Sequence, residues 1–285
     1  LGNTLYQLYH CRKKEGESAY RKDMVAAAYP LLHGRGGDKS RDFIEMLSRA
    51  NTGHGTWEPG WEIRKIERNG QRAAYRDGLT LWISPKQFFP HDGGGDDDGG
   101  KIEVGKKGYI AMVKEFRALL PGFYMANGNA PLDQTPPLVR IYWNVGSQDA
   151  ALLMRVLTRE LNDANIPFQF KVLSDPSSFF RTDAGVLYIS KRHLKDSRNA
   201  LGNVYGRTKN VLKPETSLFC KRLAPGVSLA EDPRNGESFG QHRTRILAEA
   251  LCQATTYENK ILAKEDRFNH VSAYLEKSGV NMLAP

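Results

Sequence analysis

The sequence predicts an α+β fold, a mainly antiparallel sheet with flanking helices, and two observations lead to this class. From Trp57 to Phe89, apolar and charged residues alternate with period two, and Asn69-Gly70 and Asp77-Gly78 are hairpin turn signals. Further along the chain, strand-like and helix-like segments alternate without regular βαβ units, which argues against a doubly wound parallel sheet.

The N-terminal part is expected to combine helices with this meander. Residues 1–12 suit a short helix, and Ser40 is typical of the N-cap of a helix that ends before Gly53. Residues 110–120 are predicted to form a helix and residues 122–126 a strand. The tryptophans of the meander are interpreted as core residues: Trp57, Trp61 and Trp82.

The segment from Asn127 to Pro137, rich in Pro, Asn and Gly, is the candidate domain boundary. It separates residues 1–130, helices and meander with an expected role in peptide binding, from residues 131–285, an expected catalytic part; one continuous globule is the alternative. In the second part we expect strands at 139–145, 168–173 and 185–190, an extended segment at 217–229, and helices at 148–164, from about 191, at 240–254 and at 259–278.

Composition restricts the partners of this chain. Its 285 residues carry a net charge of +9, which favours an acidic partner: nucleic acid, an anionic membrane surface, or a phosphorylated or acidic peptide. A basic surface without such a partner is the alternative. We expect no nucleic-acid partner and no membrane association, because the sequence has neither a nucleic-acid-binding motif nor an apolar run of about 18 residues.

No metal or cofactor is expected. The three cysteines are far apart in the sequence, so they suggest neither a disulfide framework nor a zinc site, and the chain is expected in a reducing compartment without a signal peptide. The acidic segment 91–100 lacks the spaced ligands of a calcium loop. There is no Walker A loop, GxGxxG, HExxH or GxSxG motif, and His193 and His242 are isolated.

Cationic side chains inside apolar strands are the main signal for a functional site. Lys171 lies in the apolar run 168–173, where a lysine is costly to bury without a partner or a role. Arg181 precedes the next predicted strand, and Arg140 lies two residues before Tyr142, on the same face of an earlier one. The alternative is that these side chains snorkel or face solvent on half-exposed strands.

These residues carry a first resemblance. Lys171-Val172, followed by Arg181 and then Leu187-Tyr188-Ile189, resembles the core of the bacterial phosphothreonine lyases, the OspF and SpvC effector family, over residues 139–190. In that family the Lys-Val segment supplies a catalytic lysine and a later arginine binds phosphate. A lysine and a histidine of the preceding strand fall on Arg140 and Tyr142 here, so the sequence departs from the family pattern at the proton donor.

A second resemblance covers residues 57–251. The runs KVLSDPSSFFRTDAGVLYIS and LAEDPRNGESFGQHRTRILAEAL are similar to the HopA-type effector family. Its bacterial relatives act as lyases in the biosynthesis of class V lanthipeptides and thioamitides. There, a kinase-like partner phosphorylates Ser or Thr of a precursor peptide, and the lyase eliminates the phosphate to leave a dehydroamino acid.

The resemblance implies roles for named residues. Lys171 would remove the Cα proton, since a neutral lysine can act as a base, and Tyr142 would donate a proton to the leaving oxygen. Phosphate would be bound by guanidinium groups, which match its geometry. The candidates are Arg181 first, then Arg140, then Arg243 and Arg245 at a helix start, with Lys221 as a further candidate or simply an exposed edge lysine.

The sequence therefore predicts a cofactor-free carbon–oxygen lyase that converts phosphoserine or phosphothreonine of a precursor peptide into dehydroalanine or dehydrobutyrine. Its expected location is the bacterial cytoplasm, or a host cell if it is a secreted effector. The alternative from another class is a non-catalytic effector that binds a phosphopeptide or a host protein at the same basic site.

Overall fold

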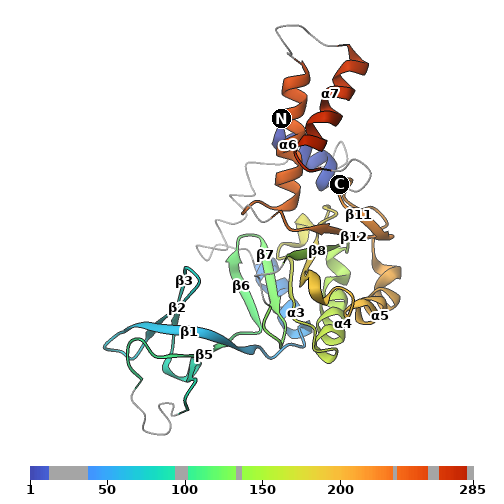
Figure 1. Ribbon diagram of the computed structural model, residues 1–285. Helices are drawn as coiled ribbons and strands as arrows, with labels where there is room; N and C mark the ends of the chain where they lie inside the picture. Colours follow the sequence, from blue (N-terminus) through green and yellow to red (C-terminus); the bar gives the residue numbers. More distant parts are fainter. Residues whose placement is uncertain (13–37, 94–101, 133–136, 234–235, 256–262, 281–285) are drawn as a thin grey trace.

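The computed structural model describes residues 1–12, 38–93, 102–132, 137–233, 236–255 and 263–280. In these residues the chain forms two antiparallel sheets with flanking helices, which confirms the predicted α+β class. Figure 1 shows the smaller sheet projecting from the larger one, with a helical hairpin on the opposite side of the molecule.

The smaller sheet is the predicted meander, extended by two further strands. Its strands run in the order β3-β2-β1-β5-β4. Asn69-Gly70 lies between β1 and β2, and Asp77-Gly78 lies between β2 and β3, so both predicted hairpins are confirmed. The strands are β1 (Thr56–Ile66), β2 (Arg72–Arg76), β3 (Leu79–Ile83), β4 (Phe88–Pro90) and β5 (Lys107–Met112).

The tryptophans of this sheet do not all lie in its core. Trp61 is fully buried, but Trp57 is 48% exposed and Trp82 is 54% exposed, so the core interpretation is wrong for these two. Trp57 and Trp61 would share a face in a regular strand, but the register of β1 against β5 shifts between Glu58 and Trp61. A bulge of this kind turns the following side chains to the other face.

The larger sheet has seven strands in the order β11-β12-β8-β10-β9-β7-β6, and every neighbouring pair is antiparallel. Strands β6 and β7 precede residue 130 and still belong to this sheet; the division at residues 130 and 131 stays a prediction. The strands are β6 (Glu115–Leu120), β7 (Phe123–Asn127), β8 (Leu138–Trp143), β9 (Gln169–Leu173), β10 (Gly185–Ser190), β11 (Lys221–Ala224) and β12 (Val227–Glu231).

The predicted helix at residues 110–120 is wrong. This segment contains the end of β5 and all of β6, which pair with different sheets. Residues such as Ala, Met, Lys, Glu and Leu favour a helix locally, but pairing with β1 and with β7 overrides that preference. The chain thus passes from one sheet to the other through two residues, Val113 and Lys114.

Helices cover both faces of the larger sheet. One face packs against α3 (Asp38–Ala50), α4 (Ala150–Asp163) and α5 (Arg198–Thr208) in a large apolar core. Ser40 lies inside α3, so the predicted N-cap is wrong, although the helix does end before Gly53. After β10, a short 3-10 turn at residues 191–193 precedes α5, where one helix from about residue 191 was predicted.

The opposite face is covered by N-terminal and C-terminal segments together. The short helix α1 (Gly2–Leu5) and the π-helical turn η1 (Tyr6–His10) lie beside α6 (Phe239–Thr255), and α6 pairs with α7 (Lys264–Lys277). No helix in the described ranges is long and apolar enough to cross a membrane. Most of the acidic segment 91–100 lies outside the described residues.

Candidate functional site

Strand register gathers the predicted base and acid on one face of the seven-stranded sheet. Val186 on β10 pairs with Lys171 on β9 and with Tyr142 on β8. Residues paired across neighbouring strands project from the same face, so Lys171 and Tyr142 lie in one row, with Cα atoms about 10 Å apart. This is the face covered by η1 and α6 rather than by α4.

The next row of the same face carries Gln169, Tyr188 and Arg140, because Tyr188 pairs with both of the others. The Lys171 ammonium lies 5.4 Å from the centre of the Tyr188 ring and 4.7 Å from that of Phe123. The Arg140 guanidinium lies 5.4 Å from the centre of the same Tyr188 ring. Tyr188 therefore stands between two cations, and both contacts are of the cation–π type.

Lys171 and Arg140 differ in their partners. In the part of the chain that the structure describes, the half-buried Lys171 ammonium has neither an ion pair nor a hydrogen bond. Arg140 is buried, and its Nε and Nη2 donate to Asp232 Oδ2 at 2.9 and 2.5 Å. Burial disfavours the charged guanidinium, but Tyr188, Tyr142 and Asp232 outweigh burial and raise the pKa of Arg140.

Arg181 is 4% exposed and paired by a neighbour in its own loop. Its Nε donates to Asp183 Oδ1 at 2.7 Å and its Nη2 to Asp183 Oδ2 at 2.6 Å, a bidentate pair, and Nη2 also donates to the Tyr6 hydroxyl at 3.0 Å. Burial opposes the ionisation of Asp183, yet Arg181 and His10 hold its pKa well below the usual range. The Arg181 guanidinium group, which was predicted to bind phosphate, is thus already paired with the Asp183 carboxylate.

Tyr142 lies beneath the N-terminal segment and α6. Its ring makes an edge-to-face contact with His10, with centroids 5.5 Å apart, and a tilted contact with Phe239 at 6.5 Å. Burial, with a smaller contribution from Cys220, raises the pKa of Tyr142 well above its ordinary value. The phenol therefore stays protonated at neutral pH, as a proton donor requires.

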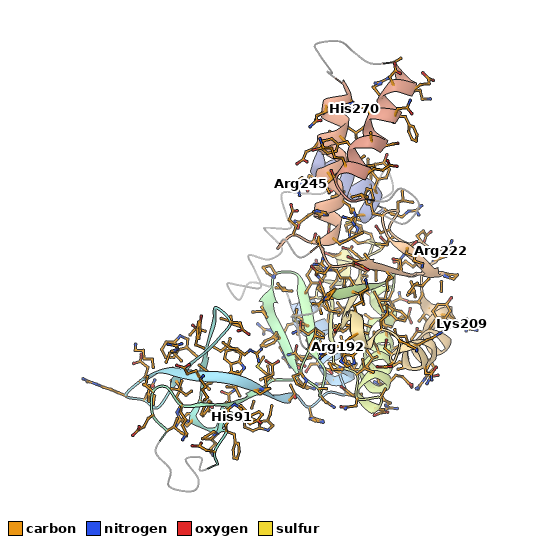
Figure 2. The ribbon with its side chains drawn as sticks, in the orientation of Figure 1. His91, Arg192, Lys209, Arg222, Arg245 and His270 are labelled. Carbon is orange, nitrogen blue, oxygen red and sulfur yellow. The ribbon has the colours of Figure 1, made fainter. Side chains whose placement is uncertain are left out.

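The three remaining candidates lie at the edges of this face. Arg243 is half-buried over the Phe239 ring at 4.8 Å, and burial lowers its pKa. Arg245 is exposed and paired with Glu237 and Glu249, and Lys221 is exposed on the edge strand β11. Figure 2 places Arg245 on α6 above the sheet and Arg222, the neighbour of Lys221, on the outer hairpin.

Comparison with known proteins matches residues 115–285 to the sequence model of the HopA1 effector protein family. The chain belongs to this family. The matched range holds the whole seven-stranded sheet and every predicted site residue, whereas the five-stranded sheet precedes it. Membership gives no particular activity.

Two solved structures of Pseudomonas syringae effector proteins are similar to this family member. The effector from pathovar tomato strain DC3000 shares 16% identity with a TM-score of 0.47, over 85% of this chain and 79% of that one. The effector from pathovar syringae strain 61 shares 16% identity with a TM-score of 0.45, over 90% of this chain and 94% of that one. The comparison with curated protein sequences gave no match.

Several residues of this face had no role in the sequence interpretation. Tyr188 belongs to the Leu-Tyr strand that the sequence showed, but its position between Lys171 and Arg140 follows only from the strand register. Asp183 could have been noticed as an acid two residues after Arg181. His10 gave no local signal, because it reaches the face from the other end of the chain.

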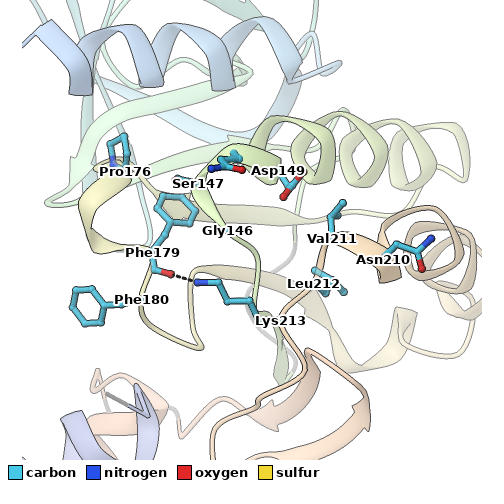
Figure 3. A pocket seen from close by; sticks show the side chains of 11 residues that line it. Gly146, Ser147, Asp149, Pro176, Phe179, Phe180, Asn210, Val211, Leu212 and Lys213 are labelled. Carbon is cyan, nitrogen blue, oxygen red and sulfur yellow. Dashed lines mark hydrogen bonds between the residues drawn. The ribbon is translucent and has the colours of Figure 1, made fainter. Parts of the chain in front are cut away.

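A separate cleft of about 620 Å³ opens at one end of the sheet, where residues that follow β8, β9 and α5 meet. Lys213 Nζ donates across it to the carbonyl oxygen of Phe179 at 2.8 Å, drawn as the dashed line in Figure 3. Its lining carries one carboxylate, Asp149, and one ammonium, and it contains none of the predicted site residues.

Proposed function

We propose that this protein is a carbon–oxygen lyase that eliminates phosphate from phosphoserine or phosphothreonine in a peptide. The observation that carries the proposal is Lys171, a half-buried lysine without a carboxylate partner in the described residues, held between two aromatic rings in one row with a protonated tyrosine. A lysine that no carboxylate pairs, in one row with a proton donor, suits removal of a proton from carbon when the lysine is in its neutral form.

The reaction needs only proton transfers and one anion site. Lys171 takes the Cα proton, the electron pair of that C–H bond forms the Cα=Cβ double bond, and the Cβ–O bond breaks. Phosphate leaves with the electrons of that bond, and Tyr142 gives the leaving oxygen a proton. The product is dehydroalanine from serine or dehydrobutyrine from threonine, and no cofactor takes part in these steps.

The geometry ranks the candidate phosphate ligands. Arg243 carries no acidic partner in the described residues, its Nε is buried without a hydrogen bond, and it reaches the Tyr142 end of the face through Phe239. Arg140 and Arg181 are engaged by Asp232 and Asp183, so each would have to share its donors with the phosphate. Arg243 therefore stands first in the proposal, and Arg181 remains a predicted ligand.

Mass spectrometry of a phosphorylated peptide incubated with the protein tests the proposal. Elimination lowers the peptide mass by about 98 Da, one phosphoric acid, whereas a phosphatase lowers it by about 80 Da. Lys171→Ala should reduce the elimination rate by about 10³-fold, because a positioned base contributes on that order. The control is Lys191→Ala, since Lys191 is 52% exposed and paired with Glu231, and should keep full activity. A wild-type protein that leaves every phosphopeptide unchanged contradicts the proposal.

A non-catalytic effector is the second candidate. Arg140 and Arg181 are paired with buried or half-buried carboxylates, and such ion pairs also occur in purely structural networks. Phosphopeptide affinity separates the two. A lyase with Lys171→Ala should keep most of its affinity while losing turnover, whereas a binder shows no turnover and loses affinity only. In either case the proposed partner is a phosphorylated peptide, with a kinase-like protein as its source, in the bacterial cytoplasm or in a host cell.

The five-stranded sheet is proposed to take part in holding the peptide. Its outward face carries exposed Trp57, Phe89 and Trp82, and side chains of this kind supply contact area for an extended chain. Trp57→Ala together with Trp82→Ala should weaken peptide affinity and leave the turnover of bound peptide unchanged.

A further inference from the structure

The first eleven residues cover the Tyr142 end of the site. The His10 ring contacts the Tyr142 ring edge to face at 5.5 Å and the Phe239 ring at 6.4 Å. His10 is 2% exposed and Tyr142 is 4% exposed. One side of the Tyr142 ring is thus covered by His10, which is far from the strands of this sheet in the sequence.

The imidazole of His10 is held at both nitrogens. Nδ1 lies 3.0 Å from Ser217 Oγ, and Nε2 lies 3.5 Å from Asp183 Oδ2. Asp183 is itself fixed by the bidentate contact with Arg181. The ring orientation of His10 is therefore set by loops that precede β10 and β11, and not by its own helix.

The backbone around His10 is fastened to the same loops. Thr182 Oγ1 donates to the His10 carbonyl at 2.6 Å, and the Thr182 amide donates to the Cys11 carbonyl at 3.2 Å. On the other side, Gly240 approaches so closely that a Cβ there would lie 2.5 Å from the His10 ring. The imidazole has room for one orientation only.

A histidine held between a serine and an aspartate also occurs in nucleophilic sites, but in this trio the serine hydroxyl is engaged by neighbouring side chains. Ser217 Oγ lies 3.0 Å from His10 Nδ1 and also hydrogen-bonds with the Cys220 thiol. What the trio does contact is the ring of Tyr142, through His10. The trio therefore reaches the sheet face through the Tyr142 ring.

We propose that His10 is a positioning residue for Tyr142, and that Asp183 and Ser217 hold His10 in place for this task. The edge-to-face contact fixes the plane of the Tyr142 phenol ring over the sheet face. His10 itself touches no reacting atom. This role rests on the proposed lyase function, because it assigns the orientation of that reaction's proton donor.

A double-mutant cycle between His10 and Tyr142 tests the role. His10→Phe keeps an aromatic ring but loses both polar contacts; it should lower kcat for phosphopeptide elimination about tenfold and leave KM within about twofold, because orientation matters in the transition state. In a Tyr142→Phe background the same change should have almost no further effect on kcat. Leu8→Ala is the control, since Leu8 lies on the same segment and is 45% exposed.

Ser217→Ala serves as the second variant, because it removes one hydrogen bond and leaves the His10 ring in place. Ser217→Ala should lower kcat about threefold and leave KM unchanged. This variant keeps the test possible if a lowered thermal midpoint shows that His10→Phe fails to fold. An unchanged kcat in a folded variant, or an equal loss in the Tyr142→Phe background, overturns the positioning role and leaves the lyase function standing. A wild-type protein without elimination overturns both.

Discussion

On one face of the seven-stranded sheet, the end around Lys171 is half-open to solvent, whereas the end around Tyr142 is covered by residues 2–11 and α6. At the open end a cation meets aromatic rings and no acid in the described residues. At the covered end Arg181 and Asp183 neutralise each other, and His10 is held at both ring nitrogens. An available charge suits reaction or binding, and a satisfied one suits stability.

The largest expected effect is on stability at the covered end. Arg181→Ala leaves Asp183 as a buried carboxylate without its main partner and should lower the free energy of unfolding by about 3–5 kcal/mol. Lys171→Ala at the open end should change it by about 0.5 kcal/mol or less. Urea unfolding of both variants measures the contrast. Similar losses at the two ends would contradict this division of roles.

The second largest expected effect is a loss of folding stability at the covered end in acid. Asp183 has a pKa well below that of an unfolded aspartate, which is about 3.9. Its contribution to stability is therefore present above about pH 4 and is lost as pH falls through that value toward the folded pKa. Unfolding free energies between about pH 6 and about pH 3 should fall more steeply for the wild type than for Asp183→Asn. Parallel curves would show that Asp183 does not carry this dependence.

The smallest of these effects concerns the close approach of α6 to the N-terminal segment. A Cβ at Gly240 would lie 2.5 Å from the His10 ring and 2.7 Å from the Tyr6 ring, so Gly240→Ala should cost about 1–3 kcal/mol by overpacking. Gly202→Ala is the matched control: Gly202 lies in α5 with open space around it, and this change should stabilise the protein by about 0.5–1 kcal/mol. Thermal midpoints of the two variants should move in opposite directions.

Local patterns in the sequence were enough for the strands that surround the site. Period-two alternation and turn residues located β1 to β3, and the apolar runs located β8, β9 and β10 within a residue or two. The local patterns failed where pairing with distant strands determines the structure. Residues 110–120 favour a helix by composition, but they pair with strands of two different sheets. A bulge in β1 also turns Trp57 and Trp61 to opposite faces of the smaller sheet.

For the site itself, the resemblance to the phosphothreonine lyases suggested Lys171 and Tyr142 together, and strand alternation placed Arg140 on the same face as Tyr142. The sequence could not foresee that Arg181 is engaged, since this depends on the fold of a loop around Asp183. Nor could it foresee His10, whose partner Ser217 is 207 residues away. Contacts of such separation leave no periodic trace in the sequence.

This long separation has a consequence for how the molecule folds. Strands β9 and β10 are near neighbours in sequence, so the Lys171 end closes through a short loop, whereas Tyr6 must find Asp183 across 177 residues and His10 must find Ser217 across 207. Closing such loops costs entropy before any contact is gained, so these contacts form late. On the ribosome, residues 2–11 are made before Ser217 and dock after it, and a chain interrupted before residue 217 has the Tyr142 end of the sheet face without its cover.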